Sequence, residues 1–319
     1  MKVPGYDFGE MKMFQTEEGV TQGAPESPVL YSVFINDLVE CLRAKGIGVR
    51  VVGKLRPALL FADDIAIMVD TVEEIHRALR IVTEYARKWR FSFDGKKNAV
   101  MAWGSRGFRD RVKEQGFTCT NSMVPVKSEY KYLGVIVTEN LRWNRQVEKM
   151  IASCKARTNS LIWRLTNGRR VRPRTAIYAR NAMVRPVLEY ASEIWAHELS
   201  EDQETRIEKI QRRFVRKMCQ LPGGTPTAFI KLEYGVERMR ARWDKLTIRF
   251  LEKVVVMDKE RLTRQALSLR IRNRGQGSWW VKVKEMLAMS RFDGVLSQIN
   301  GMDDLQQVME AVVFDVDKR

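Results

Sequence analysis

The spacing of apolar positions predicts the elements in the first part of the chain. From Ser27 to residue 45, apolar side chains recur every three or four positions, which predicts a helix with Ser27 as its N-cap and Pro28 as its first residue. Two short apolar runs, 58–61 and 65–69, follow on either side of an acidic pair. Because apolar runs joined by a tight polar turn form hairpins, they predict a β-hairpin in a buried sheet.

One more helix and three more strand segments complete this part. Thr71 and Glu74 have the spacing of a capping box, which predicts the start of a second helix. Residues 91–93 and 99–103 predict a second hairpin around an Asp-Gly turn. Residues 132–137 predict one further strand.

Beyond this strand the pattern is helical almost throughout. Ser200 and Gln203 predict a capping box for a helix that ends before a Leu-Pro-Gly-Gly sequence. The sequence therefore predicts an α+β fold in two domains. Residues 1–138 would hold a sheet with packed helices, and residues 139–319 would be all-helical.

The net positive charge of the chain predicts a negatively charged binding partner. The 319 residues contain 56 Lys and Arg against 39 Asp and Glu, a formal charge of +17 at pH 7, and residues 142–185 hold twelve of the bases and one acid. Such a stretch attracts nucleic acid, and Trp143, Trp163 and Tyr178 would stack on bases or riboses. The alternative is a solvated helical face whose tryptophans lie in the core. The candidate phosphate contacts are Arg142, Arg145, Arg157, Arg164, Arg169, Arg170, Arg172 and Arg174.

Composition disfavours several other classes of protein. No run approaches the about 18 to 20 apolar residues that cross a bilayer, and the first residues lack the apolar core of a signal peptide, so no membrane partner is expected. The four cysteines stand outside any CxxC pair, which excludes a zinc finger and favours a reducing, intracellular compartment. Residues 169–174 are also typical of a nuclear-localisation patch, and both nucleus and cytoplasm stay open.

Asp63 and Asp64 are the sharpest chemical feature. They are adjacent and lie between apolar strands, where like charges repel unless a cation binds between them. Carboxylate oxygens suit Mg²⁺, and two such ions about 4 Å apart assist phosphoryl transfer. Taken alone, the pair is also compatible with an ordinary solvated turn, in which Asp is common.

Four motifs occur in the order and spacing of the reverse transcriptase family. Residues 61–64 (Phe-Ala-Asp-Asp) resemble the family's Tyr/Phe-x-Asp-Asp box, and residues 19–28 resemble its Gly-Val-x-Gln-Gly-x-x-x-Ser-Pro segment. Residues 93–98 are similar to the loop that carries the family's lysine, and residues 130–135 to its primer-grip hairpin. Residues 189–214 resemble the C-terminal helical segment of non-LTR (LINE-type) retrotransposon members.

The resemblance implies a polymerase palm in residues 1–138 and a helical thumb in residues 139–319. The implied reaction is RNA-templated transfer of a deoxynucleotide from a dNTP to the 3′-hydroxyl of a DNA primer. Asp63 and Asp64 would be ligands of two Mg²⁺ ions, with Mn²⁺ as the alternative, and Lys97 would assist the departure of pyrophosphate. The residues that would shape the nucleotide and primer sites are Gln22, Gly23, Ser27, Phe61, Ala62, Leu133 and Gly134.

Part of the family pattern is missing. The family has a third catalytic carboxylate several tens of residues before its Gln-Gly pair, whereas Asp7, the sole aspartate before Gln22, lies much too close to it. We therefore expect an N-terminally truncated enzyme that is inactive or weak by itself, with the absent portion as a further partner. The alternatives are a catalytically dead nucleic-acid-binding relic and a maturase-like protein of intron origin, which residues 195–222 argue against. A histidine is also usual near Gln146, which leaves the geometry there open.

Overall fold

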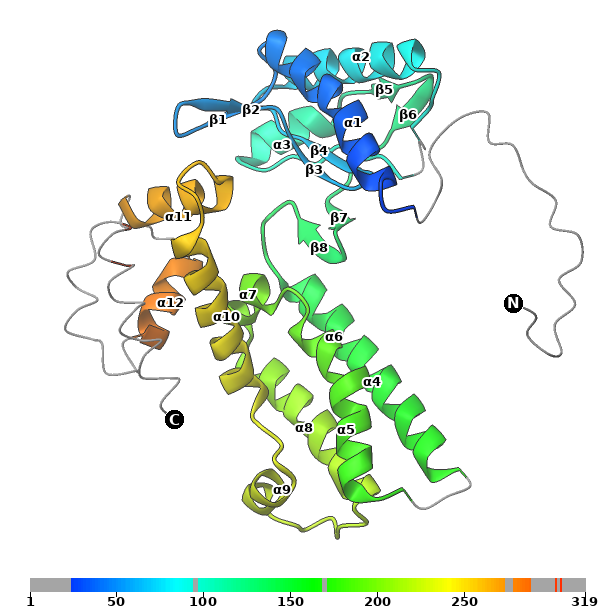
Figure 1. The fold of residues 1–319 in the computed structure, drawn as a ribbon, viewed down its shortest axis with the longest axis vertical. Coiled ribbons are helices and arrows are strands. Elements are labelled where there is room, and N and C mark those ends of the chain that lie inside the picture. The colour runs from blue at the N-terminus through cyan, green and yellow to red at the C-terminus, as the bar shows by residue number, and fades with distance from the viewer. Residues whose placement is uncertain are drawn as a thin grey trace, which may run out of the picture. The chain divides into compact units, whose positions relative to one another are not determined.

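The chain divides into two compact units, and the computed structural model describes most of both. The described residues are 24–93, 97–167, 171–272 and 278–287, together with Met302 and Leu305. The first unit is Met1–Lys96 with Phe117–Met123, and the second is Lys97–Gly116 with Val124–Arg319. Helices and short strand pairs occur in both (Figure 1), which confirms the predicted α+β class. The division into a palm and a thumb after residue 138 stays a prediction.

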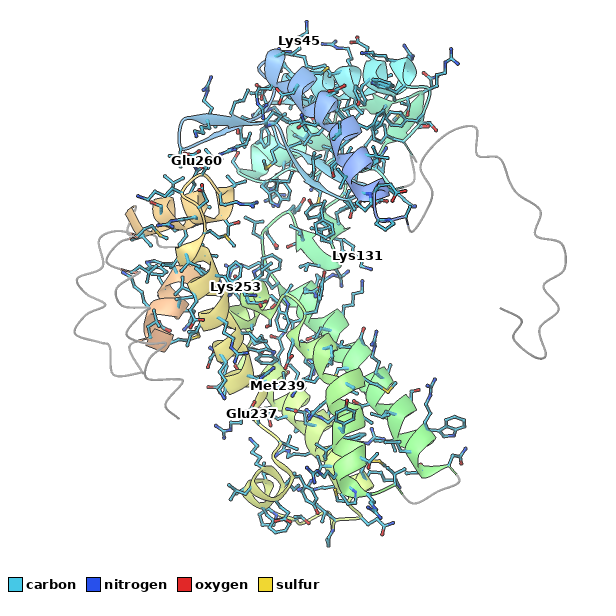
Figure 2. The ribbon with its side chains drawn as sticks, in the orientation of Figure 1. Lys45, Lys131, Glu237, Met239, Lys253 and Glu260 are labelled. Atoms are coloured by element: carbon cyan, nitrogen blue, oxygen red, sulfur yellow. The ribbon has the colours of Figure 1, made fainter. Side chains whose placement is uncertain are left out.

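Two packed helices and two hairpins make up most of the first unit. Leu38 and Leu42 on the first helix and Val82 on the second are buried. Arg77 donates a hydrogen bond of 2.7 Å to the backbone oxygen of Lys45, which follows the first helix and is labelled in Figure 2. The elements are α1 (Ser27–Ala44), β1 (Val49–Val51), β2 (Lys54–Arg56), β3 (Ala58–Phe61), β4 (Asp64–Ile67), α2 (Val72–Lys88) and β5 (Phe117–Cys119).

The start and the apolar face of α1 differ from the prediction. Glu26 is the N-cap, and Ser27 is already helical, because the chain turns earlier and Ser27 N–H donates to the Ala24 carbonyl oxygen at 3.2 Å. Leu30 and Val33 were expected on the buried face but are 53% and 69% exposed. Helical spacing predicted the helix correctly, but it does not show which of the apolar residues on the helix pack against another element.

The hairpin β3–β4 forms as predicted, but it is not buried in a larger sheet. Within the part of the chain that the structure describes, the strands form four separate two-stranded sheets, β3 pairing with β4 alone. Leu59 and Leu60 are each 38% exposed as a result, and Phe61 is 63% exposed. Apolar side chains therefore face solvent on both α1 and this hairpin.

The cap of α2 is displaced by one residue from the expected box. Thr71 Oγ1 accepts a hydrogen bond from Glu74 N–H at 3.2 Å, as predicted. The Glu74 carboxylate, however, accepts from Asp70 N–H at 3.0 Å. Both free amide groups at this end of the helix are still satisfied, which is the physical purpose of the box.

The predicted second hairpin is wrong. Residues 91–93 are not a strand, and the expected turn lies at 94–96, outside the described residues. Val100 instead forms a parallel bridge with Val126 and accepts a hydrogen bond from Lys127 N–H at 2.9 Å. A partner distant in sequence therefore replaces the local one.

The second unit is a helical bundle with hairpin β7–β8 at its start. The predicted single strand at 132–137 is two strands joined by a tight turn. The elements are α3 (Arg106–Lys113), β7 (Glu129–Tyr132), β8 (Val135–Thr138), α4 (Asn144–Thr166), α5 (Pro173–Met183), α6 (Arg185–Glu189), α7 (Ser192–Trp195), η1 (Ala196–Glu198), α8 (Glu201–Met218), α9 (Thr227–Tyr234), α10 (Met239–Val256), α11 (Leu262–Arg272) and α12 (Ser278–Leu287). The remaining strand, β6 (Ser122–Val124), pairs with β5.

Two buried tryptophans mark the centre of this bundle. The rings of Trp195 and Trp243 meet edge to face, with centroids 5.7 Å apart. The capping box of Ser200 and Gln203 at the start of α8 is confirmed. Met239, labelled in Figure 2, begins α10, and its N–H donates to the Glu208 carboxylate on α8 at 3.0 Å. No helix among the described residues is long and apolar enough to cross a membrane.

Candidate functional site

The acidic pair lies at the tip of hairpin β3–β4. Phe61 and Asp64 are the last paired residues, so Ala62 and Asp63 form a two-residue turn. Ala62 has φ +48°, a left-handed conformation that L-residues adopt at a cost. The side chains of Asp63 and Asp64 are both exposed. The hairpin therefore presents two carboxylates on a tight, conformationally constrained turn.

Tyr31 on α1 faces this acidic tip. Burial raises the pKa of the Tyr31 hydroxyl, and the negative charge of Asp63 raises it further. The Asp63 carboxylate is therefore close enough to α1 to act on a phenol there. Helical spacing gives no signal for this role of Tyr31. Ser27 lies on the same helix and is buried.

The donor set of the tip suits a hard cation. Carboxylate oxygens are preferred ligands of Mg²⁺, which is commonly held by one or two of them plus substrate phosphates. Among the described residues, no group of three or more His, Cys, Asp and Glu side chains is placed to hold a metal ion. Asp63 and Asp64 thus fit the chemistry of the ion but supply few of its ligands. Gln22 and Gly23, which are predicted to shape the nucleotide site, lie outside the described residues.

Hairpin β7–β8 presents backbone at its tip. Leu133 and Gly134 form the two-residue turn, with φ values of +45° and +84°. Tyr190, which follows α6, donates a hydrogen bond of 2.5 Å to the Leu133 carbonyl oxygen. A Cβ atom added to Gly134 would lie 3.0 Å from the Tyr190 ring. The sequence identified the turn but did not identify Tyr190 as the residue that supports it.

Replacing Gly134 with alanine is expected to destabilise this hairpin by about 1–2 kcal/mol. The positive φ disfavours a Cβ atom, and the Tyr190 ring blocks it. Urea unfolding of Gly134→Ala measures the loss. Gly223→Ala, at a position where an added Cβ meets nothing within 4 Å, is the control. Equal midpoints for the two variants would contradict the proposed packing of Tyr190 on the turn.

Lys97 lies beside the same hairpin. Its backbone oxygen accepts a hydrogen bond of 2.5 Å from the hydroxyl of Tyr130 on β7, and its side chain is exposed. Gln146 on α4 also contacts the hairpin, since its side-chain oxygen accepts from Ile136 N–H at 2.9 Å. The neutral Gln146 side chain therefore connects the hairpin to α4 of the bundle.

The basic residues from 142 to 185 are not equivalent. Arg145 is paired with Glu129 at 2.9 Å, and this hydrogen bond raises the pKa of Arg145. Arg180 is buried, and burial lowers its pKa. Arg169 and Arg170 lie outside the described residues. Exposed guanidinium groups that form no ion pair among the described residues belong to Arg142, Arg157, Arg164, Arg172 and Arg174.

Two of the three interleaved aromatics are free to stack. Trp163 is 64% exposed and Tyr178 is 76% exposed. Trp143, by contrast, packs against the bundle core. The alternative that the tryptophans lie in the core is therefore correct for Trp143 and wrong for Trp163. Exposed aromatic side chains among cations are typical of surfaces that bind single-stranded nucleic acid.

Comparison with known proteins indicates the class of domain that contains these two hairpins. Residues 3–137 match the profile of the family described as "Reverse transcriptase (RNA-dependent DNA polymerase)". The match spans the acidic tip and reaches the last strand of hairpin β7–β8. Residues 3–137 are therefore a reverse transcriptase domain, as their motifs indicated.

The lineage follows from a relative that also covers part of the helical bundle. The chain is 26% identical over 230 residues to "RNA-directed DNA polymerase from mobile element jockey" of Drosophila funebris. This similarity covers 70% of the chain and 24% of the relative, so the chain matches about a quarter of that protein. Together the two matches support a reverse transcriptase of the non-LTR (LINE-type) retrotransposons. Members of this family generally use divalent metal ions.

Proposed function

We propose that this chain contributes to RNA-templated DNA synthesis by a non-LTR retrotransposon. The observation that carries the proposal is the tight turn of β3–β4, which presents the adjacent Asp63 and Asp64 within a reverse transcriptase domain. Template RNA, a DNA primer and dNTPs are the substrates of such a reaction. Transfer joins the primer 3′-hydroxyl oxygen to the α-phosphorus of the dNTP and releases pyrophosphate.

Each candidate residue has a separate task in this reaction. Asp63 and Asp64 would hold a divalent ion, which when bound neutralises charge on the reacting phosphates. The exposed Lys97 ammonium would contact the departing pyrophosphate or give it a proton. The Leu133–Gly134 turn would place backbone groups against the primer end, because glycine permits close approach. Tyr190 would hold this turn in place through its hydrogen bond to Leu133.

The site is expected to work poorly in this chain by itself. A pair of divalent ions needs more ligands than Asp63 and Asp64 provide, and the described residues offer no larger cluster. The apolar side chains of Leu60 and Phe61, which shortly precede these carboxylates in the sequence, are exposed, as is that of Val33 on α1. We propose that a further portion of the same enzyme supplies a third carboxylate and covers this surface. The same lack of ligands is the observation that favours the second candidate, a catalytically dead nucleic-acid-binding relic.

Primer extension with an RNA template, dNTPs and Mg²⁺ tests the proposal. We expect weak incorporation by the chain, and background incorporation by Asp63→Asn because the main ligand loses its charge. Asp70→Asn is the matched control, since Asp70 is also exposed and lies in the same unit. Background incorporation by the wild-type chain would favour the relic. Robust incorporation that Asp63→Asn abolishes would instead show that no further carboxylate is needed.

Reversing four exposed arginines is expected to weaken nucleic-acid binding. The variant carries glutamate at Arg157, Arg164, Arg172 and Arg174, which removes four phosphate contacts and adds repulsion. We expect affinity for an RNA–DNA duplex to fall by about 100-fold or more at 100 mM salt, measured by fluorescence anisotropy. The control carries the same reversals at exposed cations of the C-terminal helices and the loops beside them, namely Arg238, Arg249, Lys253 and Lys259. Equal affinities for the two variants would reject residues 142–185 as the contact surface.

A further inference from the structure

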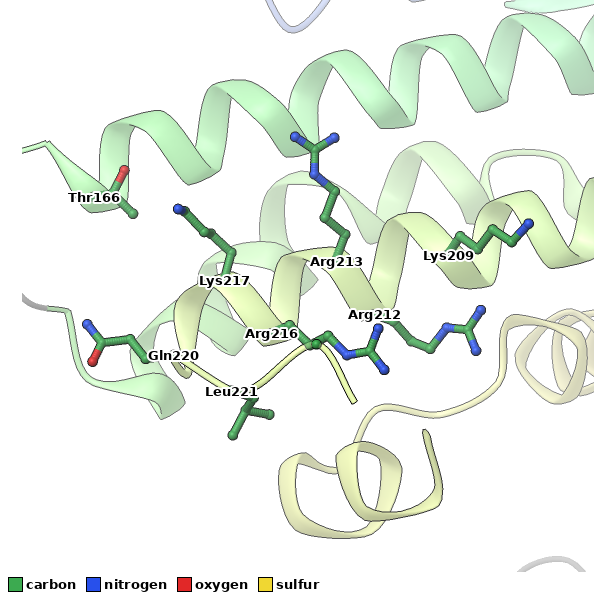
Figure 3. A pocket seen from close by; sticks show the side chains of 9 residues that line it. Thr166, Lys209, Arg212, Arg213, Arg216, Lys217, Gln220 and Leu221 are labelled. Carbon is green, nitrogen blue, oxygen red and sulfur yellow. The ribbon is translucent and has the colours of Figure 1, made fainter. Parts of the chain in front are cut away.

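A basic groove runs along the C-terminal half of α8, and its cations lie outside the segment 142–185 on which the proposed contacts depend. Its volume is about 710 Å³. Thr166 at the end of α4 and the loop that follows α8 complete its wall, and none of the described residues that line it is acidic. Figure 3 shows its lining side chains, of which the cations are Lys209, Arg212, Arg213, Arg216 and Lys217.

These cations are unpaired, whereas their neighbours are not. Arg206, one turn earlier on α8, makes a 2.7 Å ion pair with Glu148. Glu204 and Glu208 on the same helix pair with Arg240 and Lys231. Across the described ranges, by contrast, no carboxylate lies within 4.0 Å of any of the five groove cations. Glu204 and Glu208 of α8 therefore form ion pairs with other helices. The cations in the C-terminal half of α8 have no carboxylate partner among the described residues.

The spacing of the cations makes this arrangement unfavourable in the absence of a ligand. Lys209, Arg213 and Lys217 follow one another at four-residue intervals, and Arg212 and Arg216 do the same. Like charges at this spacing repel across one helical turn. The negative end of the helix dipole stabilises cations only in about the last turn, so it accounts for Arg216 and Lys217 alone. A bound anion would remove the repulsion of all five.

Two of the arginines are already fixed in position. Arg212 donates to Thr227 Oγ1 at 3.0 Å, and Arg216 donates to the Thr225 carbonyl oxygen at 2.8 Å. These bonds hold the loop after α8 against the helix. Arg216 Nε is buried and has no hydrogen-bond partner among the described residues. In Figure 3, Arg213 and Lys217 extend instead toward the side of Thr166, and both are exposed.

The lining indicates the class of ligand. It contains no aromatic ring, so it offers no surface on which a base would stack. Lys209, Arg213 and Lys217 form a row with a repeat of about 6 Å, which suits a chain of phosphates better than a single phosphate ion. We infer that this groove binds the sugar–phosphate backbone of a nucleic acid strand, independently of sequence, as a second contact beside the proposed surface at 142–185.

Anisotropy with a labelled 20-nucleotide RNA and with a DNA duplex of equal length tests the groove. The variant carries glutamate at Lys209, Arg213 and Lys217, which leaves the loop-holding Arg212 and Arg216 intact. We expect affinity to fall by about 10- to 100-fold, and the slope of log K against log salt concentration to fall by about three. The control carries the same change at Arg249, Lys253 and Lys259, which are exposed elsewhere in this unit, and is expected to change affinity less than about 3-fold.

Several outcomes would overturn the inference. Unchanged affinity would do so, as would a loss of affinity with an unchanged salt slope. A milder variant with glutamine at Arg213 and Lys217 should lose binding without loss of helicity in circular dichroism, which excludes unfolding as the cause. Poly-glutamate that competes as strongly as RNA would identify an acidic polypeptide as the partner instead. The variant at 157–174 is measured in parallel, so that failure of either surface is seen separately.

Discussion

Raising the salt concentration from 50 to 200 mM is expected to weaken binding of this chain to an RNA–DNA duplex by about 1,000-fold. Cations that contact phosphates release condensed counterions, and six such contacts give a loss of this size over a fourfold change in salt. The chain has a formal charge of +17, and both basic surfaces described above lie in its second unit. Anisotropy over a series of NaCl concentrations measures the slope.

The salt series also separates electrostatic binding from other modes. The four-residue and three-residue reversals should each lower the slope by about one for every phosphate contact removed. The aromatic variant Trp163→Ala should lower affinity for single strands but leave the slope unchanged, since a ring carries no net charge. A wild-type slope of less than about two would contradict phosphate binding as the main source of affinity.

Replacing Trp243 with alanine is expected to lower the free energy of unfolding by about 3–5 kcal/mol. Trp243 is 1% exposed, packs edge to face on Trp195, and donates a 2.7 Å hydrogen bond to the Leu188 carbonyl oxygen. The substitution leaves a cavity and an unpaired carbonyl oxygen between α10 and α6, and both raise the cost. Since whole domains are stable by about 5–15 kcal/mol, this loss would be a large fraction of the total free energy of unfolding.

Trp163→Ala is the matched control for this effect. Trp163 has the same side chain in the same unit but is 64% exposed, so its removal should cost about 0.5 kcal/mol or less. Urea titrations followed by circular dichroism give both midpoints. Similar midpoints for the two variants would show that the Trp195–Trp243 contact is not the centre of the core.

The buried Trp195–Trp243 pair is also connected to the turn that is the proposed primer contact. Trp195 donates a 3.0 Å hydrogen bond to the backbone oxygen of Tyr190, and Tyr190 in turn supports the Leu133 carbonyl. The core of the bundle therefore reaches the tip of hairpin β7–β8 through two hydrogen bonds. Trp243→Ala should therefore also disturb the Leu133–Gly134 turn, although the substitution is not in the turn.

Local patterns were sufficient wherever a structure depends on neighbours in sequence. The acidic turn, the start of α8 with its Ser200–Gln203 box, and the motifs at 61–64 and 130–135 are set by residues within a few positions of each other. Hydrogen bonds of caps and tight turns close over such short distances, so the sequence shows them directly. For the same reason, the motifs were enough to indicate a reverse transcriptase domain.

Contacts between distant segments could not be predicted in this way. Val100 pairs with Val126 rather than with its nearer neighbours, and Leu30 and Val33 stay exposed although their spacing matches that of buried positions. The charge of Asp63 acts on Tyr31 of α1, and Tyr190 donates to the Leu133 carbonyl oxygen, in both cases between residues that are distant in the chain. A hydrophobic pattern gives the face of an element but not the surface that it meets, and only the fold supplies that surface.

The sequence by itself determined the family motifs, the two candidate carboxylates and the basic character of the chain. The tertiary structure decided which charges remain available to a ligand. Arg145, Arg206 and Arg240 are neutralised by carboxylates from other elements, whereas the cations at the end of α8 are not. Charge can be counted along a chain, but ion pairs form only where folding brings opposite charges within about 4 Å. The groove on α8 therefore emerged only from the folded chain.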